Sequence, residues 1–369
     1  MSGPAVIVVG AGVVGAACAE ALAEAGCRVT VLESAFPGAG ATGAAMGHLV
    51  VMDDSEAQFA LTSWSRRLWA ERAASLPPDA EDHACGTLWI AADEEEMRLV
   101  RGKAAFYEAR GETVEVLDAR ALREAEPQLR QGLAGALRVP ADRVVYPPAA
   151  AAVFLDGARR HGAEVLSSRR VEALVPGRAL CGGRWIEADA VVNAAGAEAP
   201  RLLPGLPVVP RKGHLVITDR YPGFLSHQVI ELGYLKSAHT LAHESVAFNL
   251  QPRRTGQVLV GSSRELVGWD SSVNRPLCER MLRRAVAVVP GLSRLRALRT
   301  WVGFRPATPD GLPLVGAWEP GLWVAAGHEG LGVTTAPGTA RLVADLVLGR
   351  TPPIDPSPFD PRRKMPALA

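Results

Sequence analysis

Three glycines near the start of the chain, Gly10, Gly12 and Gly15, have the spacing G-x-G-x-x-G between an apolar run and an alanine-rich stretch. In a strand–turn–helix unit these glycines permit a tight turn, a close backbone approach to a pyrophosphate and close helix packing. Glu33 follows at the spacing of a carboxylate that accepts hydrogen bonds from ribose hydroxyls. The pattern predicts a dinucleotide site. It does not separate NAD from FAD, and a turn between packed elements is the structural alternative.

A second glycine-rich loop runs into a predicted helix near the other end of the chain, in GHEGLGVTTAPGTARLVADLV from Gly327 to Val347. An NAD-dependent dehydrogenase would explain the first glycine loop but would leave this one without a role.

Two blocks of sequence have the pattern of parallel strands that alternate with helices. Residues 5–33 predict strand, turn, helix and strand, and the apolar strands favour burial on both faces. A helix predicted over 148–161, with Gly162 at its end, leads to a buried strand that ends at 193–196.

The intervening segments have a different pattern. Residues 56–139 mix amphipathic helices with charged surface, and residues 207–300 alternate like half-buried strands in KGHLVIT, SVAFNLQP and GQVLVGSSRE.

Composition excludes several classes of protein. The 369 residues include 40 Lys+Arg and 39 Asp+Glu, a balance that does not favour nucleic acid or a charged membrane surface. Five dispersed cysteines without a C-x-x-C pair argue against a disulfide scaffold, a zinc site or an iron–sulfur cluster. The N-terminus has neither a basic leader nor an apolar span, so we expect no transmembrane segment and a cytoplasmic location.

Five stretches together resemble the FAD-dependent D-amino acid oxidase superfamily, in its glycine/sarcosine oxidase-like branch: VIVVGAGVVGAACAEALAEAGCRVTVLE, GAGATGAAMGHL, ADAVVNAAG, VGFRPATPDGLPLVG and the second glycine loop. The resemblance implies an α/β fold, in which a Rossmann-type FAD-binding domain is interleaved with an α+β substrate domain carrying a mixed, largely antiparallel sheet. We assign residues 1–55, 140–206 and 301–369 to the FAD-binding domain, and 56–139 and 207–300 to the substrate-binding domain.

The same resemblance implies where FAD lies. The loop 327–332 would lie beside the flavin pyrimidine, and the following helix would point its N-terminus at ring atoms N1 and O2, where negative charge develops. Thr42 matches a phosphate-side Ser/Thr, and 43–48 would run along the flavin. Some relatives attach FAD covalently through a histidine that matches Ala44 here, so non-covalent FAD is expected. The implied cofactor-binding residues are Gly10, Gly12, Val13, Val14, Gly15, Glu33, Thr42, Gly47, His48, Val171, Gly196, Gly327, Gly330, Leu331, Gly332, Val333 and Thr334.

Three residues are candidates for acting on substrate. Arg305 matches the arginine that clamps the substrate carboxylate in amino-acid-oxidising relatives, and the alternative is a structural pair with Asp310. A neutral imidazole at His48 could hydrogen-bond an amine or a hydroxyl, or modulate flavin N5, and the alternative is a histidine satisfied by backbone at the start of a strand. Glu329 could pair with a substrate ammonium or make the loop rigid, with His328 supporting that loop.

Other residues have weaker assignments. Lys212 and His214 share one strand face, which we interpret as solvated or interdomain. Two tryptophans, Trp269 and Trp301, are interpreted as core residues. Candidates for the wall of the substrate cavity, on domain grounds only, are Glu231, Tyr234 and His239.

Within the superfamily, GATGAAMGHLVVMDDSEAQFALT and GHEGLGVTTAP most resemble the β subunits of bacterial D-hydroxyproline dehydrogenases. Opine oxidase β subunits and hydrogen cyanide synthase subunits are close neighbours. This implies a small amino or imino acid substrate, and a hetero-oligomer with a second nucleotide-binding subunit and a small iron–sulfur subunit. The alternatives are a glycine or opine oxidase-type subunit, or an FAD relay that oxidises no amine itself.

Overall fold

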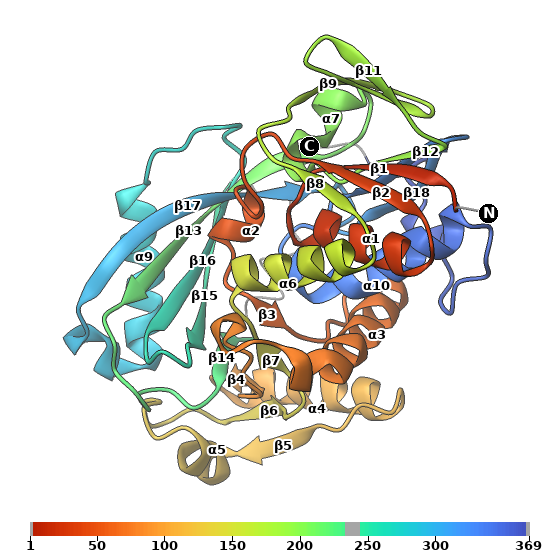
Figure 1. The fold of residues 1–369 in the computed structure, drawn as a ribbon. Coiled ribbons are helices and arrows are strands. Elements are labelled where there is room, and N and C mark those ends of the chain that lie inside the picture. Colours follow the sequence, from red (N-terminus) through yellow and green to blue (C-terminus); the bar gives the residue numbers. More distant parts are fainter. Residues whose placement is uncertain (1–2, 233–243, 367–369) are drawn as a thin grey trace.

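The computed structural model describes residues 3–232 and 244–366. Its first large sheet has six strands in the order β18-β19-β12-β1-β2-β8, and neighbouring strands are parallel except for the antiparallel pair β18 and β19 (Figure 1). Parallel strands buried on both faces account for the continuous apolar runs of the sequence. The strands are β1 (Ala5–Val9), β2 (Arg28–Leu32), β8 (Glu164–Leu166), β12 (Ala190–Asn193), β18 (Leu314–Glu319) and β19 (Leu322–Ala326).

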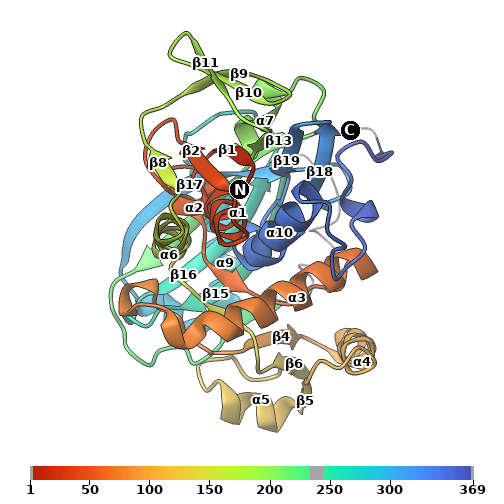
Figure 2. The same cartoon turned by 45° about the vertical axis from the view of Figure 1, so that its right-hand side comes forward.

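Helices α1 (Val13–Glu24), α6 (Pro147–Arg160) and α10 (Gly332–Val347) pack together beside this sheet, with α1 against both of the others (Figure 2). Alanines on α1 allow the close approach, because small side chains let helix backbones come near one another. Helix α3 (Glu56–Arg72) packs on α10, and the indole N–H of Trp69 donates to the carbonyls of Val333 and Thr334, at 3.0 and 3.1 Å.

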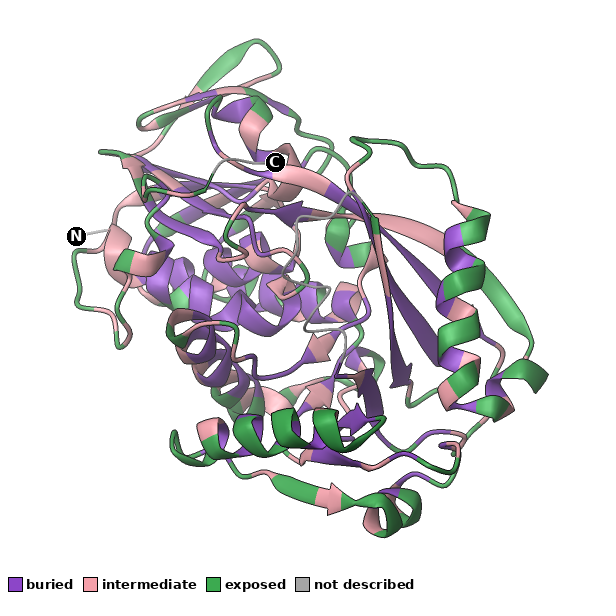
Figure 3. Cartoon of the chain, turned by 180° about the vertical axis from the view of Figure 1, so that it is seen from behind, coloured by how far each residue is buried: buried purple, intermediate pink, exposed green. Residues whose placement is uncertain are grey.

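The second large sheet has eight strands in the order β17-β13-β16-β15-β14-β4-β6-β5 and is antiparallel except for the pair β14 and β4. Helix α9 (Arg275–Val288) covers β15 and β16, whose residues are largely buried in Figure 3. The predicted half-buried alternation is therefore wrong for β16, which is buried along its whole length. The strands are β4 (Thr87–Ala91), β5 (Glu115–Asp118), β6 (Gly135–Val139), β13 (Val209–Thr218), β14 (Gln228–Glu231), β15 (Glu244–Pro252), β16 (Val258–Glu265) and β17 (Ala297–Ala307).

Smaller elements complete the described part of the chain. An antiparallel sheet joins β9 (Val171–Val175), β10 (Arg178–Cys181) and β11 (Arg184–Glu187), and β3 (His48–Leu49) pairs with β7 (Arg143–Val144). The remaining α-helices are α2 (Ala41–Ala44), α4 (Glu94–Glu108), α5 (Ala119–Ala125) and α7 (Ala199–Leu202). Short 3-10 helices are η1 (Ala73–Ser75), η2 (Pro78–Ala80), η3 (Gly196–Glu198), η4 (Pro290–Arg294) and η5 (Ser357–Phe359).

The predicted α/β architecture with a mixed, largely antiparallel second sheet is confirmed. The division into two domains stays a prediction, and its boundary at residue 301 falls inside β17, which pairs in the eight-stranded sheet. Two predicted cavity residues, Tyr234 and His239, lie outside the described residues. None of the described helices has both the length and the apolar character needed to cross a bilayer.

Candidate functional site

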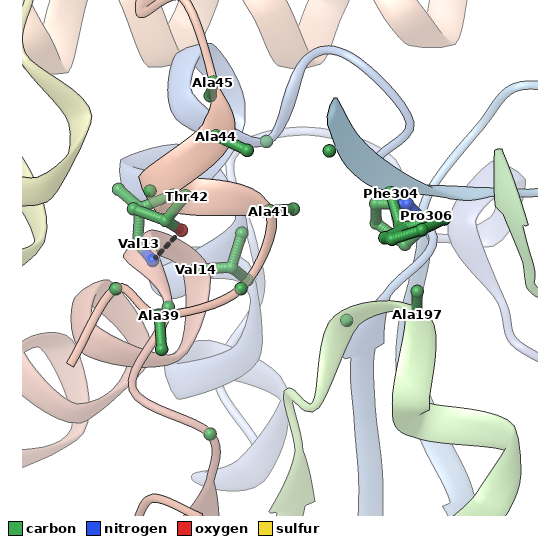
Figure 4. A pocket seen from close by; sticks show the side chains of 18 of the residues that line it. Val13, Val14, Ala39, Ala41, Thr42, Ala44, Ala45, Ala197, Phe304 and Pro306 are labelled. Carbon is green, nitrogen blue, oxygen red and sulfur yellow. Dashed lines mark hydrogen bonds between the residues drawn. The ribbon is translucent and has the colours of Figure 1, made fainter. Parts of the chain in front are cut away.

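A cavity of about 950 Å³ lies between the glycine turn after β1 and the β17 edge of the second sheet. Figure 4 shows Val13, Val14 and Thr42 on one side and Phe304 and Pro306 on the other. The predicted residues that line it are Gly10, Gly12, Val13, Val14, Gly15, Glu33, Thr42, Gly47, His48, Val171, Gly196, Arg305, Glu329, Gly330, Gly332 and Val333. Gly327, Leu331 and Thr334 do not line it.

The three glycines of the turn have different physical roles. Gly10 has a φ of 105°, and a Cβ on Gly15 would lie 2.0 Å from the Gly10 carbonyl oxygen, so both are required by the packing of the turn itself. A Cβ on Gly12 would meet only Thr42 Oγ1, at 3.2 Å. Gly12 therefore leaves open backbone facing the cavity, which is what a phosphate needs for close approach.

Two side chains hold the turn from outside. Thr42 Oγ1 accepts a hydrogen bond from the Val13 N–H at 2.9 Å, drawn as a dashed line in Figure 4. The buried Glu33 carboxylate accepts from the N–H groups of Ala11 and Ala35, each at 2.8 Å. The Ser34 hydroxyl also donates to Glu33 Oε1, at 3.2 Å. These bonds fix Glu33 at the cavity wall, and Oε2 retains a lone pair for a further donor.

The second glycine loop is held by its backbone and leads directly into α10. The Glu329 N–H donates to the Pro306 carbonyl and the Leu331 N–H to the His328 carbonyl, both at 2.9 Å. No side chain in the described part of the chain caps α10, whose first residues Gly332 and Val333 line the cavity. Uncapped N–H groups and the helix dipole make this end of the cavity favourable for negative charge.

Thr334 was predicted to contact the cofactor but has a structural role. Its hydroxyl donates to the His48 carbonyl at 2.7 Å, which ties α10 to β3. The side chain therefore positions the segment that carries His48 and does not face the cavity.

His328 supports the loop, as the sequence suggested. Its Nε2 lies 3.1 Å from Thr339 Oγ1 on α10, and the side chain is buried. Burial lowers the pKa of His328 to about 3, so the imidazole is neutral at physiological pH.

The burial of His328 predicts acid lability. Because the unfolded chain binds a proton at this histidine near pH 6.5 and the folded chain does not, stability is lost as the pH falls from about 6.5 towards 3. We expect His328→Asn to reduce the pH dependence of the unfolding free energy by up to about 1.4 kcal/mol per pH unit. Urea titrations between pH 4.5 and 7.5 measure this, with His161→Asn on the surface as the matched control. An unchanged slope in His328→Asn would contradict it.

Arg305 lies on β17 with its guanidinium over a glycine of the neighbouring strand. A Cβ on Gly213 would lie 2.2 Å from Arg305 Nη1, so only glycine leaves room for the arginine head group. The same Nη1 donates to the Ser263 carbonyl at 3.0 Å. The alternative partner, Asp310, instead makes a bidentate pair with Arg363, at 2.7 and 2.8 Å.

Glu329 lies among arginines. Its carboxylate is 3.5 Å from Arg211 Nη1 and 3.8 Å from Arg264 Nε. Burial acts to raise the pKa of Glu329, but Arg264, Arg305 and Arg211 hold it below its usual value. An ionised carboxylate bound to guanidinium groups fits the loop-stiffening alternative better than a role as partner for a substrate ammonium.

His48 begins the two-residue strand β3, pairs with Val144 and lines the cavity. Its Nε2 is buried without a hydrogen-bond partner among the residues described. Burial lowers the pKa of His48 to about 4, opposed by the side chain of Gln228. The ring is therefore a neutral imidazole that can accept a hydrogen bond, and burial disfavours its protonated form.

Several interpretations made from the sequence need correction. Lys212 and His214 are buried, so the solvated alternative for their strand face is wrong, and the interdomain alternative stays a prediction. Lys212 Nζ pairs with Asp270 at 2.8 Å, and His214 Nδ1 lies 2.8 Å from Ser263 Oγ. Trp269 is 51% exposed and packs on Phe304 at the cavity, so it is not a core residue.

Trp301 also lines the cavity, and its indole N–H donates to the Ala44 carbonyl at 3.2 Å. Glu231 does not line it, because its carboxylate accepts from the Phe248 N–H and pairs with Arg284.

Sequence reasoning missed Asn249 and Ser262, which line the cavity from β15 and β16. Both belong to stretches that were recognised as strands, but no motif distinguishes a polar residue facing a cavity from one facing solvent. Among the described residues, no group of three or more His, Cys, Asp or Glu side chains is arranged to hold a metal ion.

Comparisons with known proteins agree with this geometry. A family model described as FAD dependent oxidoreductase matches residues 5–346. Glycine oxidase of Pseudomonas aeruginosa is 30% identical over 380 residues, which cover 98% of this chain and 99% of the relative. Hydrogen cyanide synthase subunit HcnC of the same organism is 30% identical over 419 residues, with 99% and 97% covered.

The structural comparisons extend this agreement to three dimensions. The crystal structure of glycine oxidase from Geobacillus kaustophilus matches with a TM-score of 0.89 and 30% identity, over 98% of this chain and 100% of that one. L-proline dehydrogenase from P. horikoshii, at 24% identity over 98% of this chain and 97% of that one, has a TM-score of 0.88 and shows the same fold.

Proposed function

This chain belongs to the family of FAD-dependent oxidoreductases, and from that premise we propose that it oxidises the C–N bond of a small amino or imino acid. The observation that carries the proposal is Arg305, whose guanidinium is accommodated over Gly213 in the wall of the cavity that begins at the dinucleotide turn. A planar guanidinium suits a substrate carboxylate, because two parallel hydrogen bonds fix both its position and its orientation.

The residues around the cavity fit FAD. Gly12 leaves backbone open for the pyrophosphate, Glu33 is positioned for ribose hydroxyls, and the uncapped N-terminus of α10 favours negative charge at the other end. The cavity extends from one of these features to the other. Ala44 offers no nucleophile for attachment, so we propose that FAD is bound non-covalently.

FAD held by these residues would supply, at flavin N5, the acceptor for a hydride from the substrate Cα. Arg305 holds the carboxylate, so that the Cα–H has one orientation within the cavity. His48 is neutral and lines the same cavity, where its imidazole can accept a hydrogen bond from the substrate amine. Glu329 keeps the arginine cluster and the loop before α10 in place.

We propose a D-hydroxyproline-like substrate, with glycine or an opine as the alternatives. Support comes from the local sequence resemblance described above, whereas the glycine oxidases among the relatives favour the first alternative. An FAD relay without amine oxidation is the competing hypothesis, and a cavity with a carboxylate clamp argues against it.

Electron transfer to an acceptor other than NAD, in a hetero-oligomer with a second nucleotide-binding subunit and a small iron–sulfur subunit, is part of the same proposal. The similarity to a hydrogen cyanide synthase subunit, which is named as one part of a larger enzyme, is consistent with a multi-subunit assembly. The chain has no C-x-x-C pair for a cluster of its own, so the iron–sulfur centre would belong to a partner. The cytoplasm remains the proposed location.

The test is the visible spectrum of the purified protein under anaerobic conditions, before and after addition of cis-4-hydroxy-D-proline, D-proline or glycine. We expect a two-banded flavin spectrum that bleaches with at least one of them, most rapidly with the hydroxyproline. Acid precipitation should leave the flavin in the supernatant, whereas flavin in the pellet would refute non-covalent binding. Flavin that stays oxidised with a wide panel of amino and imino acids would refute the proposed function.

A further inference from the structure

Besides His48 Nε2, two buried polar atoms in the cavity wall have no partner among the described residues. Asn249 and Ser262 are 8% and 2% exposed, and both line the cavity. Asn249 Oδ1 and Ser262 Oγ make no hydrogen bond in the part of the chain that the structure describes. Because a buried polar atom without a partner is unfavourable, and such atoms are uncommon in native proteins, these two invite a ligand group that satisfies them.

Asn249 and Ser262 come from neighbouring strands of the second sheet. Asn249 on β15 is the register partner of Gly261 on β16, and Ser262 is the next residue. A Cβ on Gly261 would lie 2.7 Å from Asn249 Oδ1 and 2.9 Å from Met46 Sδ. The amide therefore leans over Gly261 towards Met46, which lines the cavity two residues before His48.

Arg305, the proposed carboxylate clamp, is close to Ser262. Arg305 Nη1 donates to the carbonyl of Ser263, the residue that follows Ser262, at 3.0 Å. Ser263 lies on β16, and Asn249 lies on the neighbouring strand β15, about 4.8 Å away. Asn249 is therefore within reach of a small molecule whose carboxylate is held by Arg305. Arg305, Asn249 and Ser262 thus line one part of the cavity wall.

We propose that Asn249 and Ser262 form a subsite for a hydroxyl group of the substrate. A hydroxyl can donate to Asn249 Oδ1 and accept from the hydroxyl of Ser262, which matches what the two side chains offer. The inference rests on the proposed function and narrows its substrate to amino or imino acids that carry a hydroxyl away from the carboxylate. Glycine and proline would leave both atoms unsatisfied, and a site that hydrogen-bonds a substrate hydroxyl rejects analogues without one.

The test compares kcat/KM for cis-4-hydroxy-D-proline and D-proline in the wild-type holoenzyme, Asn249→Leu, Ser262→Ala and Gln251→Leu. Gln251 is the matched control, because it is buried on the same strand but does not line the cavity. We expect the wild type and Gln251→Leu to prefer the hydroxylated substrate by at least about tenfold. Asn249→Leu and Ser262→Ala should bring the ratio towards one, mainly through loss of activity on the hydroxylated substrate. Retained FAD and Tm show that each variant is folded.

A binding measurement keeps the test independent of turnover. Butyrate and 3-hydroxybutyrate carry the carboxylate without an amine, and their Kd values follow from perturbation of the flavin spectrum. The hydroxylated acid should bind more tightly to the wild type, and this preference should disappear in Asn249→Leu. Equal Kd values, or a kcat/KM ratio that Asn249→Leu and Ser262→Ala leave unchanged, would overturn the subsite. Absence of flavin reduction by any amino or imino acid refutes the proposed function instead, and the hydroxyl preference in binding is then still measured.

Discussion

Replacement of Arg305 by methionine should lower kcat/KM for the oxidised amino or imino acid by about 10²- to 10⁴-fold, and FAD should remain bound. Hydrogen bonds to charged groups are worth about 1.5–3 kcal/mol each, and the guanidinium can offer two in parallel to a carboxylate. Each 1.4 kcal/mol corresponds to a tenfold change, which gives that range. The position of Arg305 over Gly213, bonded to the Ser263 carbonyl, allows the guanidinium to serve as a fixed anchor.

Two further variants separate anchoring from a general effect of charge. Arg305→Lys keeps the charge but loses the planar fork, so an intermediate loss is expected. Arg299→Met removes another cavity-lining arginine from the same strand and should have a much smaller effect. Steady-state kinetics with the flavin content measured in parallel test this. An Arg305→Met enzyme with unchanged KM, or equal losses in the two methionine variants, would show that Arg305 does not hold the carboxylate.

The second prediction with a large effect concerns FAD binding and stability, for which Gly12 and Gly15 of the glycine turn should have different roles. Gly12→Val should abolish FAD binding and leave the apoprotein folded, because a side chain there meets only the Thr42 hydroxyl and otherwise points into open cavity. Gly15→Ala should destabilise the apoprotein itself by about 1–3 kcal/mol or more, because its Cβ would lie 2.0 Å from the Gly10 carbonyl oxygen.

Thermal unfolding of the apoproteins, followed by FAD titration with flavin fluorescence, tests both statements. We expect a near wild-type apoprotein Tm with at least a 100-fold weaker Kd for FAD in Gly12→Val, on the order of 3 kcal/mol. In Gly15→Ala we expect a lower apoprotein Tm. Gly26→Ala is the control for a glycine that faces open space, although its φ of 93° adds some strain of its own. Wild-type affinity for FAD in Gly12→Val would show that the pyrophosphate does not approach this backbone.

The sequence was sufficient to predict the elements that local chemistry specifies. The apolar run at 5–9 and the glycine turn predicted a parallel strand and a helix start, and β1 and α1 lie there. The helix predicted over 148–161 corresponds to α6, with Pro at its beginning and Gly162 just beyond its end.

Features that depend on distant parts of the chain could not be predicted in this way. Lys212 is buried because Asp270, 58 residues away, reaches its ammonium group. Asp310 pairs with Arg363, 53 residues away, although Arg305 is nearer in the sequence. Asn249 and Ser262 face a cavity only because β15 and β16 are neighbours in the second sheet. Pairings of this kind arise from tertiary packing, which overrides local pattern.

Strand β17 forms one edge of the eight-stranded sheet, and its contacts limit how substrate specificity can change in such enzymes. Along one strand, the Trp301 indole donates to the Ala44 carbonyl and the Arg305 guanidinium donates to the Ser263 carbonyl beside the cavity. The chain also passes repeatedly between the two large sheets before it ends. No single cut therefore yields an exchangeable specificity module. New specificities in this architecture should arise by point substitution in the cavity wall, at positions such as 249 and 262, and not by recombination of whole segments.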